Sequence, residues 1–144
     1  MTKTRHSLFE TNSSSVHTLT LGSAPTTMPF DDENFETIYL GSGEYGWGYE
    51  KLTIWMEKAD YLAIEASSDE NKAKMLFDAL HKVYPNCIFK FEKPNNNSRS
   101  FNENCSGYID HQSYGEAWLE LGSTQDVADF LFGSGYIEID NDNH

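Results

Sequence analysis

Hydrophobic and polar positions alternate along residues 16–21 (VHTLTL), a segment rich in β-branched side chains. This pattern is typical of a strand with one buried face. We therefore expect His17, Leu19 and Leu21 on the same side of a strand. Similar short segments predict further strands at residues 37–40, 87–92 and 136–140, with shorter candidates at 108–109 and 117–121.

From Leu52 onward the apolar positions recur at the spacing of an α-helix. The stripe that predicts this helix consists of Leu52, Trp55, Met56, Ala59, Leu62, Ala63 and Ala66. Lys58 lies off this stripe. Ser67, followed by Glu70 three residues later, forms a capping-box pattern. We therefore predict a second helix that begins there and that Pro85 ends.

A third, short helix is predicted from Ser123 and Asp126, which repeat a capping pattern ahead of Phe130 and Leu131. Helices and strands do not alternate regularly along the chain, so a doubly wound parallel sheet is not expected. The sequence predicts an α+β fold with a mostly antiparallel sheet of about five strands, two central helices and one short C-terminal helix. A chain of 144 residues without a repeat or linker is expected to form a single domain over residues 1–144.

The composition narrows the class of protein. With 38% hydrophobic and 14% aromatic residues, the chain is expected to fold in water. It has no apolar leader and no run near the about 18 apolar residues of a membrane span, so we expect a cytoplasmic protein without membrane contact. Cys87 and Cys105 fit neither a disulfide framework nor metal-ligand spacing and are expected to be free thiols. We predict no cofactor and no metal.

Negative charge is concentrated in two parts of the chain, whose net charge is −13. Residues 20–50 contain six acidic side chains, residues 100–144 contain nine, and neither segment contains Lys or Arg. Such a surface repels phosphate backbones and attracts basic proteins, although excess acid also simply keeps a protein soluble. We predict a basic protein partner and no direct binding of nucleic acid. The candidate contacts are Asp31, Asp32, Glu33, Glu36, Glu116, Glu120, Asp126, Asp129, Glu138 and Asp140.

Three polar segments favour an alternative, namely a small enzyme or nucleotide-binding protein. They are residues 9–17 (FETNSSSVH), 41–48 (GSGEYGWG) and 110–113 (DHQS). Histidine beside carboxylates is suited to acid–base chemistry, and aromatic residues beside glycines can stack on a planar ligand. A turn that satisfies its own backbone would also explain the first segment. The catalytic candidates are His17, His111, Asp110 and Glu44, and the ligand-pocket candidates are Glu10, Asn12, Ser14, Tyr45 and Trp47.

The same segments, together with residues 130–132 and 140–143, resemble a group of small proteins of bacterial and phage genomes that has no known activity. The resemblance implies a phage or prophage accessory protein, for which interference with a host or defence machine is a common role. Our leading hypothesis is a non-enzymatic inhibitor in the host cytoplasm. It would bind a basic nucleic-acid-handling or defence protein in the manner of an anti-CRISPR or DNA mimic. The sequence leaves the oligomeric state open.

Overall fold

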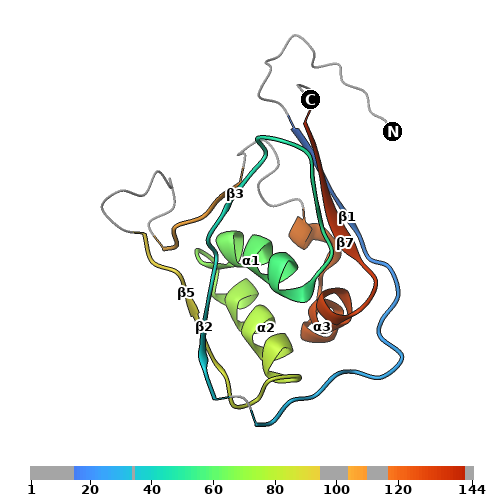
Figure 1. The fold of residues 1–144 in the computed structure, drawn as a ribbon, viewed down its shortest axis with the longest axis vertical. Helices are drawn as coiled ribbons and strands as arrows, with labels where there is room; N and C mark the ends of the chain where they lie inside the picture. The colour runs from blue at the N-terminus through green and yellow to red at the C-terminus, as the bar shows by residue number, and fades with distance from the viewer. Residues whose placement is uncertain (1–14, 34, 95–103, 110–116, 142–144) are drawn as a thin grey trace.

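The computed structural model confirms the α+β class and describes residues 15–33, 35–94, 104–109 and 117–141 (Figure 1). The helices are α1 (Trp55–Ala66), α2 (Glu70–His81), the 3-10 helix η3 (Ala117–Glu120) and α3 (Thr124–Phe132). The strands are β1 (Ser15–Thr20), β2 (Thr37–Leu40), β3 (Glu44–Tyr45), β4 (Glu50–Leu52), β5 (Ile88–Phe91), β6 (Tyr108–Ile109) and β7 (Tyr136–Asn141). Within these ranges, no helix is long and apolar enough to cross a membrane.

The strands form three small sheets, where the sequence suggested one sheet of about five strands. Sheet A is antiparallel in the order β1-β7-β4, whereas sheet B (β2-β5) and sheet C (β3-β6) are parallel pairs. Helices α1 and α2 lie between β2 and β5 in the chain, and a crossover of that length permits parallel pairing. The expectation of a mostly antiparallel sheet therefore holds for sheet A alone.

The three α-helices occupy the space between sheet A and sheet B (Figure 1). α1 is the central helix, and its residues from Lys58 to Ala66 are nearly all buried. Ile137 and Ile139 of β7 face the helices from sheet A, and Phe89 of β5 faces them from sheet B. As predicted, Cys87 and Cys105 form no disulfide in the described part of the chain, and both are buried.

The start of α2 differs from the prediction. Ser67 ends α1, and its N–H donates to the Ala63 carbonyl oxygen at 2.9 Å. Asp69 caps α2 instead, because its Oδ1 accepts hydrogen bonds from the Asn71 and Lys72 N–H groups at 3.0 and 3.2 Å. A carboxylate satisfies two of the N–H groups that have no partner within the helix.

Residues 117–121 form η3 and a turn, so the prediction of a strand there is wrong. Ala117, Trp118 and Leu121 are buried together, a spacing that one helical turn provides and an alternating strand does not. Trp118 Nε1 donates to the Leu62 carbonyl oxygen at 3.1 Å, which anchors η3 on α1.

The α1 stripe also departs from the prediction. The helix begins at Trp55, so Leu52, the first residue of the predicted stripe, lies in β4. Met56 is 44% exposed, although it lies on the apolar stripe. Lys58 is fully buried, although it lies off the stripe. The buried face of α1 is wider than the stripe because α3 and the turn that follows it cover the Lys58 side of the helix.

Candidate functional site

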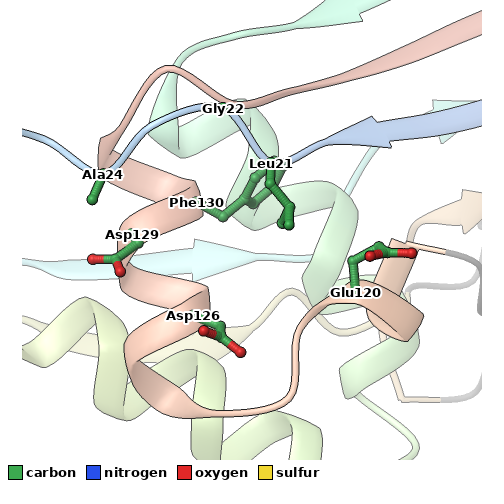
Figure 2. A pocket seen from close by; sticks show the side chains of 7 residues that line it. All are labelled: Leu21, Gly22, Ala24, Glu120, Asp126, Asp129 and Phe130. Atoms are coloured by element: carbon green, nitrogen blue, oxygen red, sulfur yellow. The ribbon is translucent and has the colours of Figure 1, made fainter.

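A hollow of about 230 Å³ lies between the start of the β1–β2 loop, η3 and α3 (Figure 2). Leu21 and Phe130 supply apolar walls, and three carboxylates border it. The residues that line this α3 hollow are Leu21, Gly22, Ala24, Glu120, Asp126, Asp129 and Phe130. None of the described residues in this lining is Lys, Arg or His. Three of the acidic residues predicted to bind a partner therefore line the same hollow.

Two of the carboxylates share a face of α3 because Asp126 and Asp129 are three residues apart, about one helical turn. The helix begins after Ser123, whose Oγ accepts a hydrogen bond from the Asp126 N–H at 3.1 Å, as the capping pattern predicts. Asp126 Oδ2 accepts from the Gly122 N–H at 3.1 Å. Gln125 Nε2 donates to Asp129 Oδ1 at 2.8 Å. Both carboxylates are thus oriented by neighbouring donors.

The wall opposite α3 is held by close packing of the β1–β2 loop against the turn after α3. Gly22 has a φ of +66°, and a Cβ there would lie 2.5 Å from the Gly135 nitrogen, so a larger residue cannot be accommodated. The Ser23 N–H donates to Ser134 Oγ at 2.8 Å, and the Ser134 N–H donates to the Ser23 oxygen at 2.9 Å. Lys58 Nζ fixes the same turn by donating to the Gly135 oxygen at 2.8 Å.

This arrangement is suited to a cationic group on an apolar stem. The carboxylates attract an ammonium or guanidinium group, while the apolar walls can cover methylene groups. Pockets for whole small molecules typically measure about 300–1,000 Å³, so a single Lys or Arg side chain fits this hollow better than a nucleotide. Among the described residues, no group of three or more His, Cys, Asp or Glu side chains is placed to hold a metal ion.

The acidic residues near position 30 lie further along the β1–β2 loop and are not among the residues that line the α3 hollow. Asp31, Asp32, Glu33 and Glu36 are exposed in the loop that leads into β2. The Asp31 N–H donates to the Val83 oxygen at 2.7 Å, so this loop is tied to the segment that follows α2.

Two further candidates lie on β7, on the face of sheet A turned away from the helices. Asp140 is exposed there, and Glu138 is half-buried. Tyr49 Oη donates to Glu138 Oε2 at 2.7 Å, and this hydrogen bond raises the pKa of Tyr49 above its usual value. Glu116, the remaining candidate, lies outside the described residues.

The described parts of the alternative pocket meet around one tyrosine of α1. His17 Nδ1 lies 2.6 Å from Tyr61 Oη, and the Tyr45 ring packs edge-on against the Tyr61 ring at 5.1 Å. Burial and the nearby Asp60 raise the pKa of Tyr45. His17 and Tyr45 are therefore both core residues. The candidates outside the described residues are Glu10, Asn12, Ser14, Asp110 and His111.

The rest of the glycine-rich segment stays near the surface. Glu44 is exposed on β3, and Trp47 is 57% exposed. The Trp47 ring stacks on the Tyr108 ring, with centroids 6.0 Å apart and planes inclined by 18°. Because β3 pairs with β6, the glycine-rich segment does lie beside the strand that leads to residues 110–113.

Sequence reasoning missed Leu21 and Phe130 as walls of the α3 hollow, and Lys58 as the side chain that secures its far side. Apolar residues and a helical lysine have many ordinary roles, so no local signal marks them. The spacing of Asp126 and Asp129 on a predicted helix was a usable signal, because it places both on one face.

No family model, curated protein or solved structure matches the chain.

Proposed function

We propose that this chain is an acidic binding protein whose α3 hollow receives a Lys or Arg side chain of a basic protein partner. The observation that carries the proposal is that Glu120, Asp126 and Asp129 line one hollow with apolar walls, and that no described residue of the lining is basic. Asp129 is half-buried, so less water screens its attraction for a cation, while Glu120 and Asp126 are exposed and add negative potential beside it. The surplus of negative charge elsewhere steers a basic partner toward the protein.

The kind of partner follows from the same charge distribution. A surface rich in carboxylates can occupy a basic channel that otherwise holds a phosphate backbone. We therefore propose a nucleic-acid-handling host or defence protein as the partner and inhibition as the outcome. The resemblance to small phage and bacterial proteins supports a phage or prophage accessory role, of anti-CRISPR or DNA-mimic type, in the host cytoplasm.

The test uses an arginine-rich peptide as the probe. The variant Asp126→Asn/Asp129→Asn keeps side-chain shape but removes two charges from the hollow. Asp31→Asn/Asp32→Asn removes the same charge elsewhere and is the matched control. We expect the hollow variant to weaken binding about tenfold, equivalent to about 1.4 kcal/mol, and the control to weaken it less than about twofold. Calorimetric titration at about 50 and about 200 mM salt measures both, and affinity should fall with salt.

Equal losses in the two variants would show that diffuse charge, and not the α3 hollow, binds the peptide. Affinity that does not change with salt would remove the electrostatic basis of the proposal altogether. Affinity capture from host cells, repeated with the hollow variant as a negative control, then identifies the natural partner by mass spectrometry.

A second candidate function is a small enzyme or nucleotide-binding protein. It is favoured by the contact of His17 with Tyr61 and of Tyr61 with Tyr45, which brings two of the three polar segments to one place. A nucleotide titration that shifts the NMR signals of the His17 ring, and not those of α3, would favour this candidate over the acidic binding protein.

A further inference from the structure

The outward face of sheet B carries an apolar patch. Tyr39 and Ile88 are 54% and 51% exposed, and Phe35, two residues ahead of β2, is 74% exposed. Thr37 pairs with Ile88, and Tyr39 pairs with Lys90, so these four side chains share one face of the two strands. We name Phe35, Thr37, Tyr39, Ile88 and Lys90 the sheet B face.

The opposite side of the same strands is covered by α2. The ring of Phe77 packs against Phe91 with centroids 5.0 Å apart, and the ring of His81 packs against Phe89 at 5.1 Å. In Figure 1, no described element lies beyond β2 and β5 on the outward side. Parallel strands are usually covered on both faces, so a pair with one apolar face open lacks a layer. A binding partner from outside the described chain would supply the missing layer.

The distribution of charged residues along β2 and β5 indicates what kind of partner fits the sheet B face. The end where β2 and β5 begin has a net charge of −3, from Asp31, Asp32, Glu33 and Glu36 beside Lys82. Among the exposed side chains at the end where they finish, Lys90 and Lys93 beside Glu92 give a net charge of +1. The carboxylate of Asp60 also lies at this end, but it is half-buried on α1 and accepts a hydrogen bond from the Gly41 N–H at 2.8 Å. Because the strands are parallel, both run from the acidic end to the basic end.

A two-fold axis can reverse the direction from the acidic end to the basic end in a second copy of the chain. If the axis lies between two such faces and runs across the strands, it places the acidic end of one copy against the basic end of the other. The same rotation brings Tyr39 and Ile88 of the two copies together at the centre. Aromatic and aliphatic side chains in the middle of an interface, with charges at its rim, form the usual anatomy of a specific contact.

We infer that the sheet B face is the self-association surface of this protein, on which a second copy docks with its strands antiparallel to the first. The face presents three exposed apolar side chains, Phe35, Tyr39 and Ile88, whereas a standard interface takes about 20–30 residues a side, so the dimer is weak and concentration-dependent. Salt near 0.1 M restricts the repulsion between two chains of net charge −13 to about 10 Å. This inference is independent of the α3 hollow and its proposed partner.

Sedimentation velocity of the full chain, at about 0.15 M salt and from about 10 µM to about 1 mM, measures the association. We expect the mass to rise with concentration from 16.4 kDa toward twice that value. Tyr39→Ser/Ile88→Ser should weaken dimerisation at least about tenfold. Val16→Ser is the matched control, because Val16 is also an exposed apolar strand residue, on sheet A. Circular dichroism verifies that each variant is folded.

The orientation is tested with charge reversal. Lys90→Glu should weaken the dimer because it places two acidic ends together, and Glu33→Lys combined with Lys90→Glu should restore it. A mass that stays at 16.4 kDa at every concentration, a dimer insensitive to Tyr39→Ser/Ile88→Ser, or failure of the rescue would each overturn the inference. None of these outcomes would alter peptide binding at the α3 hollow, so the two proposals fail separately.

Discussion

At the scale of single residues, Lys58 has the least expected environment. Its Nζ donates to the carbonyl oxygens of Phe130 and Gly135 at 2.7 and 2.8 Å, and the Gly133 oxygen lies 3.5 Å away. Burial lowers its pKa from 10.5 to about 8. The ammonium group thus joins the end of α3 to the turn that supports the β1–β2 loop. Stability and the shape of the α3 hollow both depend on it.

Replacing Lys58 with Met should destabilise the fold by about 1–3 kcal/mol at neutral pH, because buried carbonyl groups lose their donor. The advantage of the wild type over Lys58→Met should then grow as the pH rises above about 8. In that range the folded lysine is neutral while the unfolded one still binds a proton, and stability rises with pH wherever the unfolded state binds more protons. Urea unfolding of both proteins measures the difference.

The pH series should end near pH 9.5. The pKa of Tyr45 is raised in the folded protein, so above about pH 10 the unfolded tyrosine ionises first and the free energy of unfolding falls. A difference between wild type and Lys58→Met that stays constant from about pH 7 to about pH 9.5 would contradict the buried, lowered-pKa lysine.

The sequence could not predict this position, for a physical reason. The helical stripe of α1 records which side chains are apolar, and Lys58 is not. Its burial depends on carbonyl groups more than 70 positions further along the chain. Backbone acceptors leave no mark in a sequence, whereas the apolar neighbours Ala59 and Leu62 were predicted correctly because their own side chains carry the signal.

At the scale of elements, the ends of helices were predictable only in part. Ser123 caps α3 as expected, but Asp69 and not Ser67 caps α2. Both residues are good N-cap types within three positions of each other, so local preference alone does not choose between them. The choice is made by α1, which continues through Ala66 and uses Ser67 to end.

Asp69→Ala should therefore cost about 1 kcal/mol of stability, the usual value of a lost N-cap. Asp69→Asn, which keeps an accepting oxygen, should remain close to wild type. Thermal or urea unfolding followed by circular dichroism compares the two. If Asp69→Ala and Asp69→Asn lose the same amount, the carboxylate acts through its charge at the helix end and not through capping.

The positions of strands were also predictable from the local sequence, whereas their pairing depends on residues far apart in the chain. The strands at residues 37–40 and 108–109 were predicted where they lie, because alternation and β-branched residues are local signals. Their partners were not predicted, since β2 pairs with β5 across two helices and β6 pairs with β3 from more than 60 positions away. The open face of sheet B, on which the proposed dimer rests, is a consequence of that pairing.

At the scale of the whole molecule, charge is the property that the sequence describes best. The sequence alone identifies the acidic residues and shows that they outnumber the basic ones. Their arrangement was not available: Asp126 and Asp129 could be placed together from helical spacing, but Glu120 joins them only because residues 117–120 form η3 instead of a strand. The candidate site was thus predictable in its chemistry and not in its shape.

The surplus also bears on stability. Lys72 pairs with Glu65, and Lys74 pairs with Asp78, but ten basic residues cannot neutralise 23 acidic ones. A net charge of −13 destabilises a compact chain by self-repulsion, and salt screens that repulsion within about 10 Å at 0.1 M. The thermal midpoint should therefore rise as sodium chloride increases from about 10 to about 200 mM.

Differential scanning calorimetry measures this rise, and sodium chloride is preferable to sulfate because sulfate also strengthens apolar burial. Binding of a basic partner should respond in the opposite direction, since the same ions screen attraction between unlike charges. The protein would then be most stable under the conditions in which it binds least. A midpoint that falls with sodium chloride would mean that attractive pairs outweigh repulsion in the folded chain, and that its acidic side chains are largely satisfied internally.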